Sequence, residues 1–173
     1  MMHRRLNTLC LMFVIAAAPL TAQEMPKPSP EHAFLKKSAG NWDCTMKMMG
    51  QEMKCSHSSE MVGDFWVVGK FIGDFGGMKF EGRDTTGWDP VKKKYTATWV
   101  DSMSPYTMTL TGDYDAATKT MTLQGTGYHG DGKAAKFKEV IVYKSDDEYT
   151  MTMHEEKDGK FEVGFTIDYK RKK

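Results

Sequence analysis

The sequence predicts an all-β protein: a single antiparallel meander β-barrel of about ten strands, preceded by one short N-terminal helix. From Gly40 to the C-terminus, short segments alternate apolar and polar residues, and most of them end at a Gly or Asp-Gly turn. The connections are short, so consecutive strands should pair sequentially, and closure removes the exposed edges of an open sheet. A β-sandwich is the alternative, but its Greek-key crossings usually need longer connections.

A barrel of this size is expected to be hollow. Eight strands already enclose room for side chains or one small ligand, and about ten strands enclose more. The interior is therefore the first place to look for a binding site.

The first 22 residues have the pattern of a secretory signal peptide. Arg4 and Arg5 precede an apolar run from Leu9 to Ala18, and Ala22 offers a small residue at the cleavage point. The run is shorter than the roughly 20 residues that a membrane-spanning helix needs. We therefore expect cleavage near Ala22, a secreted or periplasmic protein, and no transmembrane segment afterwards.

The remaining chain is expected to form one domain. Removing 22 of 173 residues leaves 151, of which residues 23–30 form a proline-rich linker and residues 31–173 the barrel domain. The lost segment carries two arginines and no acid, so the formal charge changes from +1 to −1. A nearly neutral chain gives no electrostatic reason to expect a nucleic-acid partner.

One short helix is predicted before the strands. Ser29 suits the N-cap position, Pro30 the first helical position, and Glu31 the positive end of the helix dipole. The helix is expected to run to Ala39 and to stop at Gly40. Such a short helix is not stable alone in water, so we expect it to dock on the mouth of the barrel.

The first hairpin has a register that can be predicted from its two strands, 42–48 and 53–62. If Cys44 faces Cys55, then Met46 faces Met53 and Trp42 faces His57, and all six residues share one face. In an oxidising compartment this register predicts a cross-strand disulfide between Cys44 and Cys55.

The later strands follow the same period of two. Gly69 and Gly73 are interpreted as bulge or bend points in the third strand. The last strand should place Phe161, Val163 and Phe165 on one face together with Ile167. The strands are expected near residues 65–75, 78–88, 95–99, 106–111, 121–123, 137–143, 149–153 and 161–169.

Methionine and aromatic residues recur at the inward positions, which predicts a mostly apolar cavity for a small hydrophobic ligand. The predicted ligand-binding residues of the interior are Met46, Met61, Phe71, Phe80, Trp99, Met108, Met121, Met153 and Phe165. No cofactor and no metal ligand are predicted.

Three other functions are weaker. The methionines with His154 and Cys55 suggest a copper(I) site, but His154 has the opposite parity to Met151 and Met153. Haem binding through His57 is the second possibility. Catalysis is the third, and it has no nucleophile with a base to support it. Four aspartates, Asp84, Asp89, Asp101 and Asp115, are interpreted as ordinary residues of strand ends and turns.

The sequence shows two resemblances to known families. Gly40-Asn41-Trp42, at the head of the first strand, resembles the Gly-x-Trp opening of lipocalin-type and other calycin barrels, in which the tryptophan closes one end; the resemblance gives Trp42 that role. Most of the remaining chain resembles the bacterial domain-of-unknown-function family 1579. The motifs that carry the second resemblance are residues 77–82, 87–89, 93–95, 99–103, 112–115, 119–120 and 167–171.

That family has no established activity, so the resemblance supports the barrel more than a function. The leading hypothesis is a secreted barrel that binds a small hydrophobic molecule. The alternative is a non-enzymatic structural or protein-interaction module of the cell envelope, which predicts a filled core and an exposed apolar patch.

Overall fold

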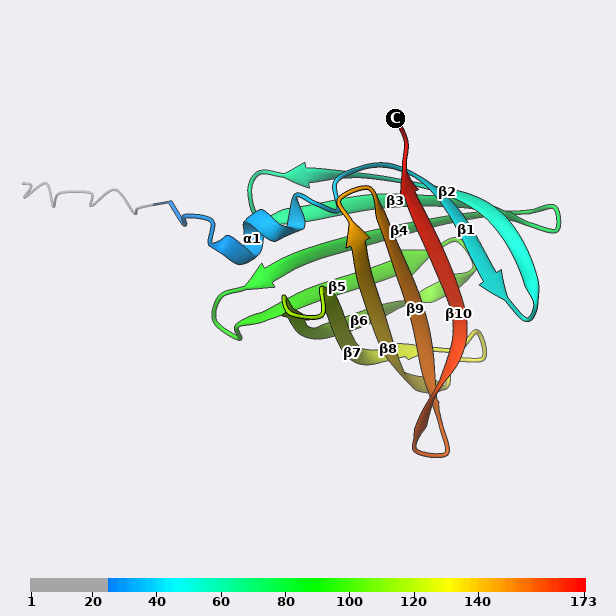
Figure 1. The fold of residues 1–173 in the computed structure, drawn as a ribbon. Helices are drawn as coiled ribbons and strands as arrows, with labels where there is room; N and C mark the ends of the chain where they lie inside the picture. Colours follow the sequence, from blue (N-terminus) through cyan, green and yellow to red (C-terminus); the bar gives the residue numbers. More distant parts are fainter. Residues whose placement is uncertain (1–24) are drawn as a thin grey trace, which may run out of the picture.

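The computed structural model describes residues 25–173 and shows one closed antiparallel barrel of ten strands, with a short helix at one end (Figure 1). The predicted signal peptide, residues 1–22, lies outside the described residues. Each strand pairs with its neighbours in sequence, and β1 pairs with β10 to close the barrel. The fold prediction is confirmed. The elements are α1 (Pro30–Leu35), β1 (Gly40–Met48), β2 (Gln51–Val62), β3 (Trp66–Phe75), β4 (Met78–Asp89), β5 (Lys94–Asp101), β6 (Ser104–Asp115), β7 (Thr120–Tyr128), β8 (Ala134–Ser145), β9 (Glu148–Lys157) and β10 (Lys160–Arg171).

The seam between β1 and β10 is held by Arg171. Its guanidinium lies over the Trp42 ring, 4.1 Å from the centroid, and donates a hydrogen bond of 2.8 Å to the carbonyl of Ala39. A Cβ at Gly40 would lie 2.3 Å from this guanidinium, so only glycine fits there. Trp42 itself is 1% exposed. The Gly-x-Trp motif of β1 and Arg171 of β10 therefore hold the seam of the barrel together.

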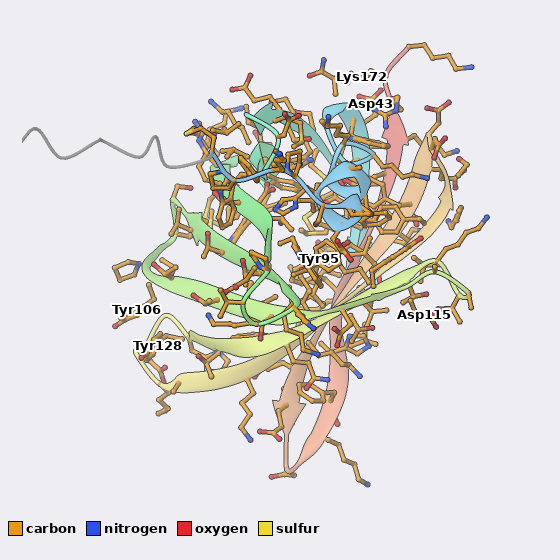
Figure 2. All side chains as sticks on the ribbon, turned by 90° about the vertical axis from the view of Figure 1, so that its left-hand side faces the viewer. Asp43, Tyr95, Tyr106, Asp115, Tyr128 and Lys172 are labelled. Carbon is orange, nitrogen blue, oxygen red and sulfur yellow. The ribbon has the colours of Figure 1, made fainter. Side chains whose placement is uncertain are left out.

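A second pair crosses the same seam on the outside. Asp43 and Lys172 form an ion pair of 3.1 Å, and Figure 2 shows them together where β1 meets the end of β10. Both side chains are substantially exposed, so this pair adds little to stability.

Helix α1 is shorter than predicted. It ends at Leu35 rather than Ala39, and the chain continues in a turn in which the amide of Ser38 donates to the carbonyl of Leu35. The Ser38 carbonyl accepts hydrogen bonds from Trp42 Nε1 and Ser59 Oγ, which ties the turn to β1 and β2. Within residues 25–173, no helix is both long and apolar enough to cross a membrane.

The first hairpin has the predicted register. Cys44 faces Cys55, and the Trp42–His57 and Met46–Met53 pairs follow. The predicted disulfide is not formed, however, because both cysteines are free thiols. Hydrogen bonds of the sheet hold the two residues opposite each other without a covalent bond.

The two thiols should differ in reactivity. The hydrogen bond between the sulfurs, together with burial, raises the pKa of Cys44, whereas that hydrogen bond lowers the pKa of Cys55. Since the thiolate is the reactive species, we expect a limiting alkylating reagent to label Cys55 before Cys44 in peptide mass spectrometry. Excess diamide should then join the two, because directly opposed strand residues lie within disulfide range. A Cys55→Ser variant is the control, and equal labelling of both thiols would contradict the assignment.

A bulge in β10 alters the predicted facing of side chains. The register of β10 shifts between Val163 and Phe165, so Val163 pairs with the outward-facing His154 and is 63% exposed. The prediction that Phe161 and Val163 share a face with Phe165 is therefore wrong, because Gly164 reverses the alternation. Further register shifts lie between Trp99 and Asp101, at the end of β5, and between Tyr143 and Ser145, at the end of β8.

The third strand has no bulge. Gly69 and Gly73 pair in continuous register with both β2 and β4, so their interpretation as bulge points is wrong. Gly69 instead leaves room for the side chains of His57 and Asp84 in the barrel interior.

Candidate functional site

The barrel encloses a cavity of about 340 Å³. Its wall is mostly apolar and is built from the inward faces of the strands. Eight of the nine predicted interior residues line it, and Met61 is half-buried and packs against the core without lining the cavity. That these residues contact a ligand stays a prediction. The eight are Met46, Phe71, Phe80, Trp99, Met108, Met121, Met153 and Phe165.

The helix closes one end of the cavity. Leu35 points into the barrel and is 2% exposed, while Phe34 stacks on Tyr114 with ring centroids 4.0 Å apart. Tyr95 belongs to the same layer and lies near the centre of the view in Figure 2, which faces this end. At the opposite end the lining residue Met48 is 37% exposed. Helix α1 therefore covers one mouth of the barrel, as expected, and the more exposed end, which we call the entrance, is the end away from α1.

An aromatic wall stands near this entrance. Phe71, Phe80 and Trp99 face one another with ring centroids 5.9–6.2 Å apart. Trp99 Nε1 donates a hydrogen bond of 2.9 Å to Asp101 Oδ2, which fixes the indole ring. Such a wall offers a flat apolar surface together with the negative faces of the rings.

A histidine–aspartate pair lies on the cavity wall, where it spans three neighbouring strands. His57 of β2 and Asp84 of β4 approach to 2.8 Å between Nε2 and Oδ1, over the backbone of Gly69 in β3. A Cβ at Gly69 would lie 2.2 Å from Asp84 Oδ1 and 2.3 Å from His57 Nε2. Glycine at this position therefore leaves the space that the pair occupies.

Glu139 of β8 is the third ionisable group of the interior. It lines the cavity between Phe137 and Ile141 on the inward face of its strand. Burial raises its pKa to about 7, and the charge of Asp84 adds to the effect. No hydrogen bond or ion pair from the described residues compensates its charge. Glu139 is thus a half-buried acid that faces the cavity and has no partner among the described residues.

Tyrosines complete the polar part of the wall. Tyr149 stacks on Tyr169 with centroids 4.3 Å apart, and Tyr143 lies next to Tyr149 at 5.6 Å. Burial raises the pKa of all three, so their hydroxyls stay protonated. They can serve as neutral hydrogen-bonding groups.

The sequence interpretation missed this polar cluster. The interpretation of Asp84 as a residue of strand ends and turns is wrong, because it lies within β4 and faces the cavity. Glu139 is not among the predicted site residues. The period of two was the available signal, because Glu139 lies on the same strand face as Phe137, Ile141 and Tyr143.

Neither metal hypothesis gains support from the geometry. His154 Nδ1 donates a hydrogen bond of 3.2 Å to the carbonyl of Lys138, so the ring does not join Met151 and Met153. His57 Nε2 is bound to Asp84, and its Nδ1 is buried without a partner. Within residues 25–173, no three His, Cys, Asp or Glu side chains are grouped as metal ligands.

These features define a calycin-like barrel protein with an internal, mostly apolar cavity. The chain belongs to the family described as "Protein of unknown function (DUF1579)", which matches residues 27–171. The resemblance found in the sequence is confirmed. No curated protein matches the chain.

Two solved structures share the fold. Rv2717c from M. tuberculosis superimposes with a TM-score of 0.57 at 12% identity, over 85% of this chain and 100% of that chain. The S-type phycobiliprotein lyase CPES from Guillardia theta gives a TM-score of 0.54 at 13% identity, over 84% of this chain and 99% of that chain. At such identity these likenesses concern the fold alone.

Proposed function

We propose that this protein binds one small, largely apolar molecule inside the barrel, and that it does so as a secreted or periplasmic protein after cleavage near Ala22. The observation that carries the proposal is the cavity of about 340 Å³ with its apolar wall and few polar groups. Ligand sites of globular proteins have this composition. The alternative, a structural module, predicts a filled core instead.

We propose binding rather than catalysis. A general base must reach the proton that it removes, and neither imidazole nitrogen of His57 is open to the cavity. Glu139 is the one acid of the cavity centre that is not already paired, and it has no nucleophile or second base at hydrogen-bond distance.

The binding function can be tested with an uncharged fluorescent probe, N-phenylnaphthylamine. Trp99 lines the cavity, so a bound probe should quench tryptophan emission through energy transfer while its own emission rises. Ala97→Phe, which places a ring in the cavity, should weaken binding by about tenfold or more, since lost cavity volume cannot be regained in a close-packed barrel.

The matched control is Thr96→Phe, which adds the same ring on the outward face of the same strand. It should leave probe binding unchanged. Circular dichroism and thermal unfolding of both variants establish that the barrel is intact. Equal binding by wild type and folded Ala97→Phe protein would contradict an internal site.

A further inference from the structure

Most of the ionisable side chains that line the cavity, apart from the tyrosines, are carboxylic acids. The lining contains three carboxyl groups, those of Asp84, Asp101 and Glu139, and one imidazole, that of His57. Among the described residues no lysine or arginine lines the cavity. A ligand that enters therefore meets acids and aromatic rings, without a guanidinium or ammonium group to bind an anion.

Two of the three carboxylates already have partners. Asp84 is paired with His57 at 2.8 Å, and Asp101 accepts hydrogen bonds from Trp99 Nε1 at 2.9 Å and from the amide of Met103 at 2.8 Å. Glu139 differs from both, because no described residue donates to its carboxylate. Its carboxylate is half-buried and faces a mostly apolar cavity, so a ligand that supplies a donor there would gain a hydrogen bond.

The surroundings of Glu139 indicate what else the ligand must present. On the neighbouring strands it is flanked by Leu123 of β7 and Met153 of β9, which are both buried and apolar. The aromatic wall of Phe71, Phe80 and Trp99 lines the same cavity. A bound molecule thus reaches Glu139 with a polar group while its remainder contacts apolar and aromatic side chains.

We propose that the cavity selects lipophilic amines: the ammonium group binds the Glu139 carboxylate, and the hydrocarbon or aromatic part packs against the methionine and aromatic wall. This inference rests on the proposed binding function and specifies its ligand class. The ammonium supplies the donors that Glu139 lacks, and the ring faces add a favourable cation–π contribution. A fatty acid or another carboxylate would be repelled by Asp84 and Glu139 and would find no compensating cation.

The test uses three probes of one shape and different charge: phenylpropylamine, phenylpropanol and phenylbutanoate. Titration calorimetry near neutral pH measures each against the full chain. Because a hydrogen bond to a charged group contributes more than a neutral one, the amine should bind about tenfold or more tightly than the alcohol. The carboxylate should bind more weakly than the alcohol.

Glu139→Gln isolates the carboxylate, since the amide keeps the shape of the side chain and removes its charge. The amine should lose about tenfold or more in affinity, and the alcohol should change by less than about threefold. Glu60→Gln, on the outward and exposed face of β2, is the matched control and should leave all three affinities unchanged. Unfolding curves of each variant show that the barrel is intact.

The outcomes separate the inference from the function on which it rests. An alcohol and an amine that bind equally, a carboxylate that binds best, or an amine preference that survives in folded Glu139→Gln protein would overturn the amine selectivity while the cavity remains a binding site. If neither N-phenylnaphthylamine nor any of the three probes binds, the binding function itself is wrong.

Discussion

Replacing Glu139 with glutamine is expected to raise the free energy of unfolding by about 3 kcal/mol near pH 8 and by less than about 1 kcal/mol near pH 5. The cause is burial of the carboxyl group, to which the charge of Asp84 adds, and together they raise its pKa from 4.5 to about 7. The ionised form is therefore disfavoured in the folded barrel relative to the unfolded chain.

The direction of the pH dependence follows from this raised pKa. The folded state holds the proton of Glu139 more tightly than the unfolded state, so the contribution to stability is complete below the unfolded pKa of 4.5. It is lost as the pH rises through about 7, where the folded state must bury a charge. The glutamine amide does not titrate, and the difference between the two pH values isolates the ionisation of Glu139.

Urea unfolding of wild-type and Glu139→Gln protein at both pH values measures the effect. Glu60→Gln serves as the control, because Glu60 is exposed on the outward face of β2 and should show no pH-dependent difference. If Glu139→Gln changes stability equally at both pH values, then the carboxyl group is not perturbed in the folded state. The same comparison establishes that the variant is folded for the ligand measurements.

Gly69→Ala is expected to destabilise the barrel because it forces the His57–Asp84 pair apart. The new methyl group would lie 2.2 Å from Asp84 Oδ1 and 2.3 Å from His57 Nε2, so the pair must separate or the strands must move. Overpacking a core costs about 1–3 kcal/mol, and losing a hydrogen bond costs about 0.5–1.5 kcal/mol. We therefore expect a loss of about 2 kcal/mol or more in the free energy of unfolding.

A double-mutant cycle with Asp84→Ala tests the stated cause. Once the carboxylate is gone, the methyl group at position 69 meets fewer atoms, so the two substitutions should be strongly non-additive. Gly130→Ala is the control, because a Cβ there would meet no atom within 4 Å. Additive effects of Gly69→Ala and Asp84→Ala would show that the glycine is needed for some reason other than the pair.

The alternation of apolar and polar residues was sufficient to predict most of the barrel. It correctly placed the Trp42, Cys44 and Met46 face of the first hairpin and its register with β2. It was insufficient where a bulge intervenes. Gly164 reverses the facing of Phe161 and Val163, and nothing in the local pattern distinguishes a bulged glycine from a paired one.

The polar cluster of the interior was harder to predict for a different reason. Asp84 resembles an ordinary strand-end aspartate when it is considered beside Thr85 and Thr86, because carboxylates are common at turns. Its role depends on His57, which is 27 residues away in sequence, and on the absence of a side chain at Gly69. Glu139 lies on a third strand, β8.

The sequence by itself determined the strand order, the first-hairpin register and the closure motif that begins at Gly40, because strand period and turn chemistry are local properties of the chain. Only the tertiary structure decided that the two facing cysteines are free thiols, that the entrance lies away from α1, and that His57, Asp84 and Glu139 share one cavity. Closure into a barrel converts positions far apart in sequence into one interior, and it is there that desolvation makes an unpaired carboxylate a candidate binding group.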